Sequence, residues 1–310
     1  MSNRLVASKE NFSPEPSPRI DHEKAKKVFY FLDINDETKK DYQARIMHFL
    51  DFITDKGMDR DSFLEYKNYL KARTDYTVST KNKYLVTAKV FLKELNRRGI
   101  LPADITQNVK SFSQSKKHKK EGLNDKEIDK LAYALKELPN SPQNTRIKAI
   151  ISLLVLQGLR QVEITRLNVK DLDLIRKTAL VEGKGRDDKE IIYLHPETVK
   201  HIKYYLKKNN LKDGALFVCR SNNNKNRRIT TRGLRLIIKK VLNDLKIDKC
   251  VHGFRHYFTT TLIKNYKGDL LRVAQYTRHR SLEMLQVYND NIKMEEDLPN
   301  YYKTFAGVKF

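Results

Sequence analysis

Cysteine is scarce in this sequence, and tryptophan and long apolar runs are absent. The two cysteines, Cys219 and Cys250, lie far apart, which excludes the paired spacing of a zinc site and the framework of a disulfide-rich domain. No run of about 18 apolar residues is available to cross a membrane, and the N-terminal residues lack the apolar core of a signal peptide. We therefore expect a cytoplasmic protein that neither spans a membrane nor depends on a bound metal.

Acidic residues are also in deficit. Asp and Glu number 38 against 62 Lys and Arg in 310 residues, which leaves a formal net charge of +24. A lysine-rich surface can serve solubility alone, but an excess of this size favours a polyanionic partner, because bound cations release the counterions condensed on DNA. Hydrophobic residues at 39% exclude global disorder, and the length allows two domains with separate cores.

Proline is concentrated at the start of the chain, in the segment Ser-Pro-Glu-Pro-Ser-Pro. Such a segment cannot form a helix, and it predicts a flexible arm over residues 1–36. Apolar residues then recur at helical spacing, which predicts a small all-helical core-binding domain over residues 37–112, with 104–112 as a candidate fourth helix. The clearest apolar stripe, on the first of these helices, consists of Tyr42, Ile46, Phe49, Leu50 and Ile53.

Residues 113–122 lack apolar periodicity and carry a basic run, so they predict a linker. Its lysines can follow a phosphate backbone or can simply keep the linker solvated. A helix expected from Ser79 onward carries further lysines that can contact DNA. The candidate DNA contacts are Lys116, Lys117, Lys119 and Lys120 in the linker, and Lys81, Lys83 and Lys89 in the helix.

Residues 123–296 predict a second domain of helices with a few short strands, followed by a C-terminal tail at 297–310. The segment 147–156 is almost continuously apolar and should form the central helix of this domain. Three strand-like segments lie within 171–194, where β-branched residues are frequent. Helical patterns then return at 196–208, 231–245, 253–265, 269–276 and 281–289.

Residues suited to binding a phosphodiester occur in order along this second domain. Arg160 lies where a buried helix ends and another begins, so its guanidinium can reach out of the core; Glu163, one turn on, can pair with it. Lys184 lies between two glycines in the turn between predicted strands. A lysine in such a turn is usually only solvated, and Arg186 and Lys189 are nearby alternatives for any chemical role.

The remaining candidates lie toward the C-terminus. His252 and Arg255 share one face at the start of a predicted helix, with His256 beside them, and Tyr288 follows His279 by nine residues. Two guanidiniums can hold the anionic oxygens of a phosphodiester, histidines can donate hydrogen bonds to it, and a tyrosine can attack the phosphorus. Each element alone is weak, but together they form a set able to cut DNA without a metal.

The order and spacing of these residues resemble the tyrosine recombinase (phage integrase) family over most of the chain. The resemblance implies a mainly α fold with a small antiparallel β-sheet, built as a helical core-binding domain and a mixed α+β catalytic domain. It implies a site-specific recombinase or integrase that cleaves and rejoins DNA through a 3′-phosphotyrosine intermediate, without a cofactor. The implied partner is double-stranded DNA with a specific recombination site, bound by a dimer on each site and a tetramer in the synapse, with accessory proteins allowed.

The resemblance also implies residue roles. The implied catalytic set is Arg160, Lys184, His252, Arg255, His279 and Tyr288, with Glu163 at the family's acidic position as structural support. We interpret His256 as a support for its helix that can also assist as a secondary base. In this set Arg160 binds the scissile phosphate, Lys184 protonates the departing 5′-oxygen, and Tyr288 is the nucleophile. An unperturbed phenol has a pKa near 10 and attacks poorly at neutral pH, so neighbouring cations must stabilise the developing phenolate.

The sequence departs from the family pattern at Arg278, where the family usually has glycine. A residue with a Cβ loses about 1 kcal/mol or more in a left-handed backbone conformation. Either the junction between the two helices is built differently here, or Arg278 contributes a DNA contact.

Two other functions remain open from the residues. The chain can be a catalytically weak DNA-binding relative with an architectural role, for which Arg278 is the one supporting feature. It can also be a type IB topoisomerase, which relaxes DNA with a similar set of residues. Relaxation of DNA without paired sites distinguishes the topoisomerase from a recombinase.

Overall fold

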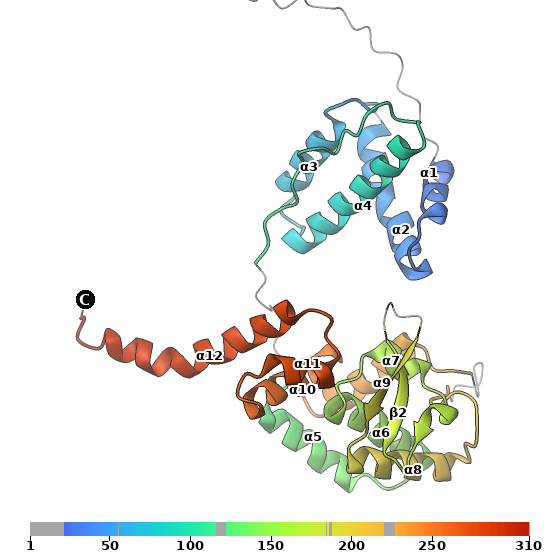
Figure 1. Cartoon of the computed structure of the whole chain (residues 1–310), viewed down its shortest axis with the longest axis vertical. Coiled ribbons are helices and arrows are strands. Elements are labelled where there is room, and N and C mark those ends of the chain that lie inside the picture. Colours follow the sequence, from blue (N-terminus) through green and yellow to red (C-terminus); the bar gives the residue numbers. More distant parts are fainter. Residues whose placement is uncertain are drawn as a thin grey trace, which may run out of the picture. The chain divides into compact units, whose positions relative to one another are not determined.

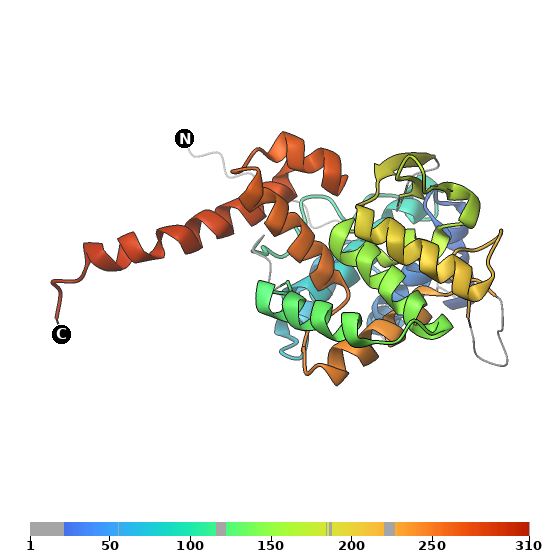
Figure 2. The same ribbon diagram turned by 90° about the horizontal axis from the view of Figure 1, so that it is seen from below.

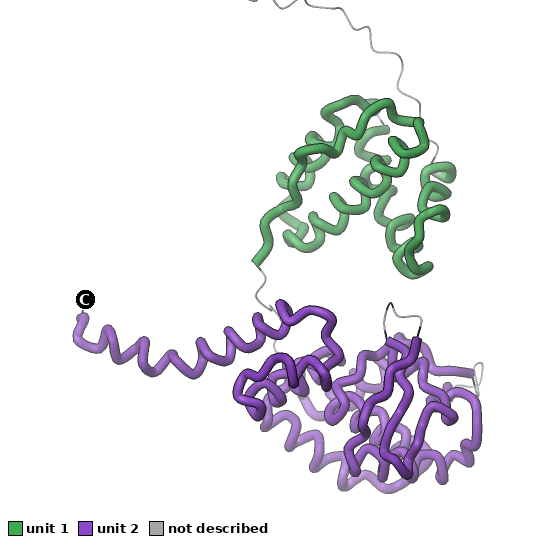
Figure 3. Tube along the Cα trace, viewed as in Figure 1, with its two compact units in different colours: residues 1–115 green, residues 116–310 purple. Residues whose placement is uncertain are grey.

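The structure, a computed structural model, describes residues 22–54, 56–115, 122–183, 185, 188–219 and 227–309. It divides into two compact units, residues 1–115 (unit 1) and residues 116–310 (unit 2), shown in Figure 3. Of the predicted functional residues, Lys184 and the linker lysines Lys116, Lys117, Lys119 and Lys120 lie outside the described residues. No helix among the described residues combines the length and apolar character needed to span a membrane.

Unit 1 consists of helices (Figure 1), and aromatic side chains make up much of its core. Its elements are α1 (His22–Val28), the short 3-10 helix η1 (Phe29–Phe31), α2 (Asp36–Thr54), α3 (Ser62–Ala72) and α4 (Val78–Arg97). Phe49, Phe63 and Phe91 are fully buried where α2, α3 and α4 meet. Helix α4 begins two residues earlier than Ser79 would predict, because Thr77 caps it by accepting a hydrogen bond from the backbone N–H of Thr80.

Two expectations for unit 1 are wrong. The predicted flexible arm extends too far, because residues 22–31 form α1 and η1 and bury Ala25, Val28 and Phe29 in the core. The prolines that suggested the arm all precede His22, and the chain regains helical periodicity immediately after them. No helix forms at 104–112, where the Asp104 carboxylate accepts hydrogen bonds from Thr106 and stabilises a turn.

Unit 2 combines helices with a small sheet (Figure 1). Its elements are α5 (Asp125–Glu137), α6 (Pro142–Leu156), α7 (Gln161–Arg166), η2 (Val169–Asp171), β1 (Leu172–Asp173), β2 (Thr178–Glu182), β3 (Lys189–Tyr193), α8 (Pro196–Asn209), α9 (Thr231–Asp244), α10 (His252–Asn265), α11 (Leu270–Thr277) and α12 (Leu282–Thr304). The strands pair in the order β1-β2-β3, and both pairings are antiparallel. The predicted fold class, mainly α with a small antiparallel sheet, is confirmed.

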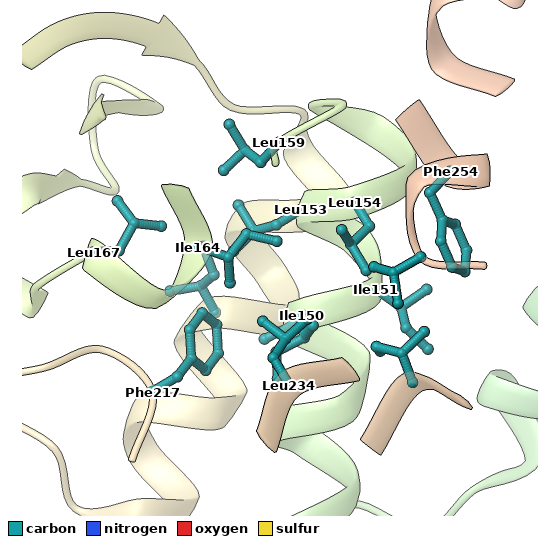
Figure 4. Packing of buried hydrophobic residues seen from close by; sticks show 14 of the residues in the cluster. Ile150, Ile151, Leu153, Leu154, Leu159, Ile164, Leu167, Phe217, Leu234 and Phe254 are labelled. Carbon is teal, nitrogen blue, oxygen red and sulfur yellow. The ribbon is translucent and has the colours of Figure 1, made fainter. Parts of the chain in front are cut away.

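Helix α6 lies at the centre of unit 2, as its apolar sequence predicts. It packs against α8, α9 and α10, and Ile150, Leu153 and Leu154 are almost completely buried. Figure 4 shows these side chains together with Phe217 and Phe254, which come from segments distant in the sequence. This packing fixes the C-terminal end of α6, from which the candidate site begins.

Helix α12 contradicts the predicted start of the C-terminal tail. It continues through Pro299 to Thr304, instead of ending before residue 297. Its first half packs on α10 and α11 through Leu285 and Ile292. Its second half reaches away from the rest of unit 2, with Tyr301 and Tyr302 exposed (Figure 2).

Candidate active site

The connection between α6 and α7 positions the first candidate, Arg160. Gly158 adopts a φ of +58°, and a Cβ there would lie 2.2 Å from the ring of Phe258, so only glycine fits. Arg160 is the N-cap residue of α7, directly before the first helical residue. Its backbone N–H and its Nη1 each donate to the Glu163 carboxylate at 2.8 Å, and Glu163 is 0% exposed. The expected ion pair between Arg160 and Glu163 therefore forms. The fully buried carboxylate of Glu163 orients the half-buried guanidinium of Arg160.

The first turn of α10 carries the second guanidinium. Arg255 is 3% exposed, and it donates from Nη1 to the carbonyl of Gly158 at 2.7 Å and from Nη2 to that of Thr277 at 2.5 Å. Arg255 thereby joins the segment that carries Arg160 to the segment that carries His279. Burial, and then the charge of Arg160, lower the pKa of Arg255 to about 10, so its guanidinium remains charged at neutral pH.

His279 follows directly after α11 and lies among these cations. Its Nδ1 is 2.7 Å from the hydroxyl of Thr277. Burial, and then the charges of Arg255 and Arg160, lower the pKa of His279 to about 3. The ring is therefore neutral at physiological pH, and it can act as a hydrogen-bond donor without adding charge.

Arg278 adopts the left-handed conformation, with φ of 57° and ψ of 41° at the end of α11. Its side chain is 5% exposed and turns inward, where Nη2 lies 2.7 Å from Glu163 and Nε lies 2.9 Å from Glu190. The junction is thus built as the family's glycine would predict, despite the Cβ. The burial and the two carboxylates argue against Arg278 as a DNA contact.

Tyr288 lies on the first half of α12 and is 6% exposed. Its hydroxyl is 3.4 Å from Nε2 of His256, and the two rings meet edge to face at 5.1 Å. His256 in turn contacts the exposed His252 ring at 4.9 Å. Burial raises the pKa of Tyr288 to about 12, although the charge of Arg255 opposes the shift. His256, which the sequence suggested mainly as a support for its helix, is a direct neighbour of the hydroxyl.

Lys184 lies outside the described residues, but both neighbouring glycines have described contacts. The carbonyl of Gly183 accepts from Arg166 Nη1 at 3.4 Å, and that of Gly185 accepts from Arg280 Nη2 at 2.6 Å. The β2–β3 hairpin is thereby held against α7 and against the junction before α12. Sequence reasoning missed both arginines, and the position of Arg280 directly after His279 was the available signal.

The alternative general acid, Lys189, is engaged elsewhere. Its ammonium lies 2.5 Å from the buried carboxylate of Asp171, and burial of that carboxylate is offset by the hydrogen bond from Lys189, so that the pKa of Asp171 is lowered overall. The Lys189 ammonium is thus held by the buried carboxylate of Asp171, which favours Lys184 over Lys189 as the general acid.

The candidate lysines of unit 1 differ in what their ammonium groups contact. Lys81 donates to the carbonyl of Lys71 at 2.9 Å, and Lys89 donates to that of Val109 at 3.4 Å. Lys83 is exposed. The first two therefore hold the backbone of unit 1, and Lys83 is the best placed of the three to meet a phosphate.

Comparisons with known proteins extend over most of the chain. A family model described as the phage integrase family matches residues 121–295. The tyrosine recombinase XerC of Lactobacillus delbrueckii subsp. bulgaricus is 29% identical over 259 residues, covering 80% of this chain and 84% of its own. The tyrosine recombinase XerD of Oceanobacillus iheyensis is 30% identical over 298 residues, covering 89% of this chain and 96% of its own. Among solved structures, the XerH site-specific recombinase bound to a palindromic difH substrate gives a TM-score of 0.72 at 20% identity, covering 90% of this chain and 84% of that one.

Proposed function

Since this chain belongs to the phage integrase family of tyrosine recombinases, which cleave and rejoin DNA by transesterification onto a tyrosine, we propose that Tyr288 is its nucleophile. The observation that carries the proposal is the position of Arg255. One guanidinium bonds both to Gly158, beside Arg160, and to Thr277, beside His279. The same guanidinium opposes the rise in the pKa of Tyr288, so it lies within electrostatic reach of the phenol.

Arg160, Arg255 and His279 form the proposed phosphate site. The two guanidiniums hold the non-bridging oxygens and stabilise the charge that develops on them in the transition state. His279 is neutral before DNA binds, because its pKa is about 3, and it donates a hydrogen bond to the same phosphate. His252, exposed at the start of α10, is the remaining proposed hydrogen-bond donor to this phosphate.

Proton transfer accompanies both bonds that change. The Tyr288 oxygen attacks phosphorus and forms the 3′-phosphotyrosine, while the bond to the 5′-oxygen breaks. With a pKa of about 12 the phenol is protonated at neutral pH, so its proton needs an acceptor, and His256 at 3.4 Å is the nearest described base. Lys184 protonates the departing 5′-oxygen. A 5′-hydroxyl from a partner strand then reverses these steps and rejoins the DNA.

The proposed partner is double-stranded DNA with a specific recombination site, bound by two copies on each site and four in the synapse. The net charge of +24 supports a polyanionic partner. XerH was solved on a palindromic substrate, and a palindromic site matches the two-fold symmetry of a protein dimer. Accessory proteins are compatible with this arrangement, and a cytoplasmic location is part of the proposal.

The replacement of the family's glycine by Arg278 no longer favours a catalytically weak relative. Arg278 was its one support, and its side chain joins two carboxylates of the site instead of replacing a catalytic group. The topoisomerase alternative is not favoured either, because the relatives on both units are recombinases.

The experiment is a trapping assay with a suicide DNA substrate nicked beside the cleavage site. Wild-type protein should form a covalent adduct, and Tyr288→Phe should abolish it while DNA affinity stays nearly unchanged, because one hydroxyl adds little to an interface made of phosphate contacts. Tyr276→Phe, at an exposed tyrosine on α11, is the matched control and should retain the adduct. An undiminished adduct from Tyr288→Phe would exclude it as the nucleophile. EDTA should have no effect, because arginines supply the positive charge.

A further inference from the structure

Arg278 combines a strained backbone with a buried charge. It is the residue at the end of α11, in a left-handed conformation that disfavours any residue with a Cβ. Its guanidinium is almost completely buried, which is unfavourable for a charge unless partners hold it. Because Arg278 has both a left-handed backbone and a buried charge, we infer that its side-chain contacts have a function in the site.

The contacts of Arg278 reach two separate segments of unit 2. Nη2 donates to Glu163 Oε2 at 2.7 Å, and this same carboxylate anchors the side chain of Arg160. Nε lies 2.9 Å from Oε1 of Glu190 on β3, close enough for an ion pair, although its direction does not make a hydrogen bond. Glu163 is therefore the stronger partner and Glu190 the weaker one.

We propose that Arg278 is a positioning residue that locks three parts of the catalytic site together: Arg160 through Glu163, the β2–β3 hairpin through Glu190, and His279 through the backbone. The proposal rests on the function proposed above. Glu163 is shared between two guanidiniums, so the position of Arg160 depends on both. Without Arg278, the junction before α12 keeps the hydrogen bonds that Arg255 and Arg280 make, but it loses its ion pairs with Glu163 and Glu190.

A purely structural role for Arg278, as the end of α11, makes different predictions. Arg278→Gly suits the left-handed conformation, so the junction keeps its shape and loses only the two carboxylate contacts. If the residue is merely a helix end, this variant should cleave DNA as the wild type does. If it positions the site, cleavage should fall although folding and DNA binding are retained.

The first measurement is the single-turnover rate of adduct formation at saturating protein, beside DNA affinity and thermal midpoint. Arg278→Gly should slow adduct formation by about tenfold to a hundredfold, as misplacement of a catalytic group does, and should change affinity by less than about twofold. Arg278→Lys, which cannot reach both carboxylates at once, should fall between this variant and wild type. Arg272→Ala, on the same helix but in an exposed pair with Asp269, is the matched control and should cleave normally.

Glu190→Gln tests the hairpin contact at a partly exposed carboxylate, and its rate can be compared with wild type even if Arg278→Gly fails to fold: a rate equal to wild type would overturn the hairpin contact. It should slow adduct formation less than Arg278→Gly does. The double variant should be no slower than Arg278→Gly alone, because the two residues act through one contact. Fully additive effects would overturn the connection between Arg278 and the hairpin.

The second measurement is the pH profile of cleavage, which a helix end would not move. Glu163 is faced by Arg160 from the start of α7 and by Arg278 from α11, with Arg255 nearby on α10. Removing one of these charges raises the pKa of Glu163, so Arg160 loses its anchor at a higher pH. The acid limb of the profile should therefore move upward in Arg278→Gly and not in Arg272→Ala.

The outcomes separate this inference from the function on which it rests. If wild-type protein forms no adduct, the proposed function fails first. If wild type forms the adduct and Arg278→Gly matches it in rate and pH profile, Arg278 does not position the site, whereas a slower rate with a shifted acid limb supports the proposal.

Discussion

The two units of this chain differ in what they bury. Among the described residues, the buried charged side chain of unit 1 is Glu94, whereas those of unit 2 are Arg146, Lys148, Glu163, Asp171, Arg255 and Arg278. Burying an ion pair rarely adds stability beyond that of apolar packing, so the buried pair of Glu163 and Arg278 indicates a role in the site. From this difference we expect charge substitutions in unit 2 to change the rate of DNA cleavage, and those in unit 1 to change mainly the affinity for DNA.

Unit 1 obtains its order from apolar packing. Its core is rich in fully buried aromatic rings, and two of its lysines hold backbone carbonyls of the same unit. Glu94 is the exception, and arginines of its own helix and the adjoining turn hold its pKa at about 2, against the effect of burial. The two ion pairs of Arg278 in unit 2 instead join segments far apart in the sequence, so losing Arg278 affects several catalytic groups.

The largest expected effect comes from the two guanidiniums of the proposed phosphate site. Arg160→Ala and Arg255→Ala should each slow adduct formation by about two to three orders of magnitude or more, because transition-state donors are lost. The measurement is single-turnover cleavage of the nicked substrate. Arg73→Ala, in an exposed ion pair of unit 1, is the control and should leave the cleavage rate nearly unchanged. If Arg73→Ala slowed cleavage as much as Arg160→Ala or Arg255→Ala, the two units would not differ in this way.

The second-largest expected effect is on the cleavage rate when Lys184, between β2 and β3 in the sequence, is replaced. Lys184→Ala should slow cleavage of ordinary DNA by about a hundredfold or more, because the leaving 5′-oxygen is no longer protonated. On DNA with sulfur at the 5′-bridging position the rate should recover, because a thiolate leaves without a proton. Lys189→Ala should show no such rescue, since its ammonium is paired with Asp171. Without rescue of Lys184→Ala, that residue is not the general acid.

The sequence predicted local elements well, because hydrophobic periodicity is set by neighbours along the chain. The helices expected at 196–208 and 231–245 correspond to α8 and α9, and the strand-like segments correspond to β1, β2 and β3. The expected pairing of Arg160 with Glu163 is also local, within one turn of helix. The order of the candidate residues was enough to indicate the family.

Contacts between distant residues could not be predicted in this way. Glu163 and Arg278 are 115 positions apart, and nothing in their local sequence states that they meet. The inward direction of Arg278 depends on the fold of α11 against α7 and β3, so a DNA contact was an equally open interpretation. Helix α1 was missed for a different reason, because the prolines before it dominated the prediction for the entire N-terminal segment.

A third, smaller effect should appear in DNA affinity. Each phosphate contact that is lost lowers the slope of log affinity against log salt by about 0.9, so deleting residues 1–115 should weaken binding and make its salt dependence shallower. In the full chain, Lys83→Ala should lower the slope by about one contact, and Lys89→Ala should not, because its ammonium bonds to Val109. Gel-shift titrations at several salt concentrations measure these slopes. Identical slopes with and without unit 1 would mean that this unit does not contact the DNA backbone.

The smallest expected effect is a pH dependence of stability that separates the two units. The pKa of His279 is about 3 in the folded protein against an ordinary value of 6.5, so between these values only the unfolded chain takes up the proton. Stability should therefore fall as the pH drops below about 6.5. His48 of unit 1 also has a pKa lowered by burial and then by the charge of Arg73, but Asp51 and Asp75 oppose that shift. No described carboxylate opposes the shift of His279, which the charges of Arg255, Arg160 and Arg278 deepen.

His279→Gln removes the titrating group and should flatten the acid side of the stability curve. Between pH 7 and pH 5.5 it should recover no more than about 1 kcal/mol relative to wild type, after allowance for solvent screening of a half-buried ring. His48→Gln, the matched control in unit 1, should recover less. Thermal unfolding of both variants and of wild type over this pH range gives the comparison. An equal or larger recovery from His48→Gln would show that the arginines around His279 do not lower its pKa beyond the effect of burial, and the electrostatic distinction between the units would not hold at this residue.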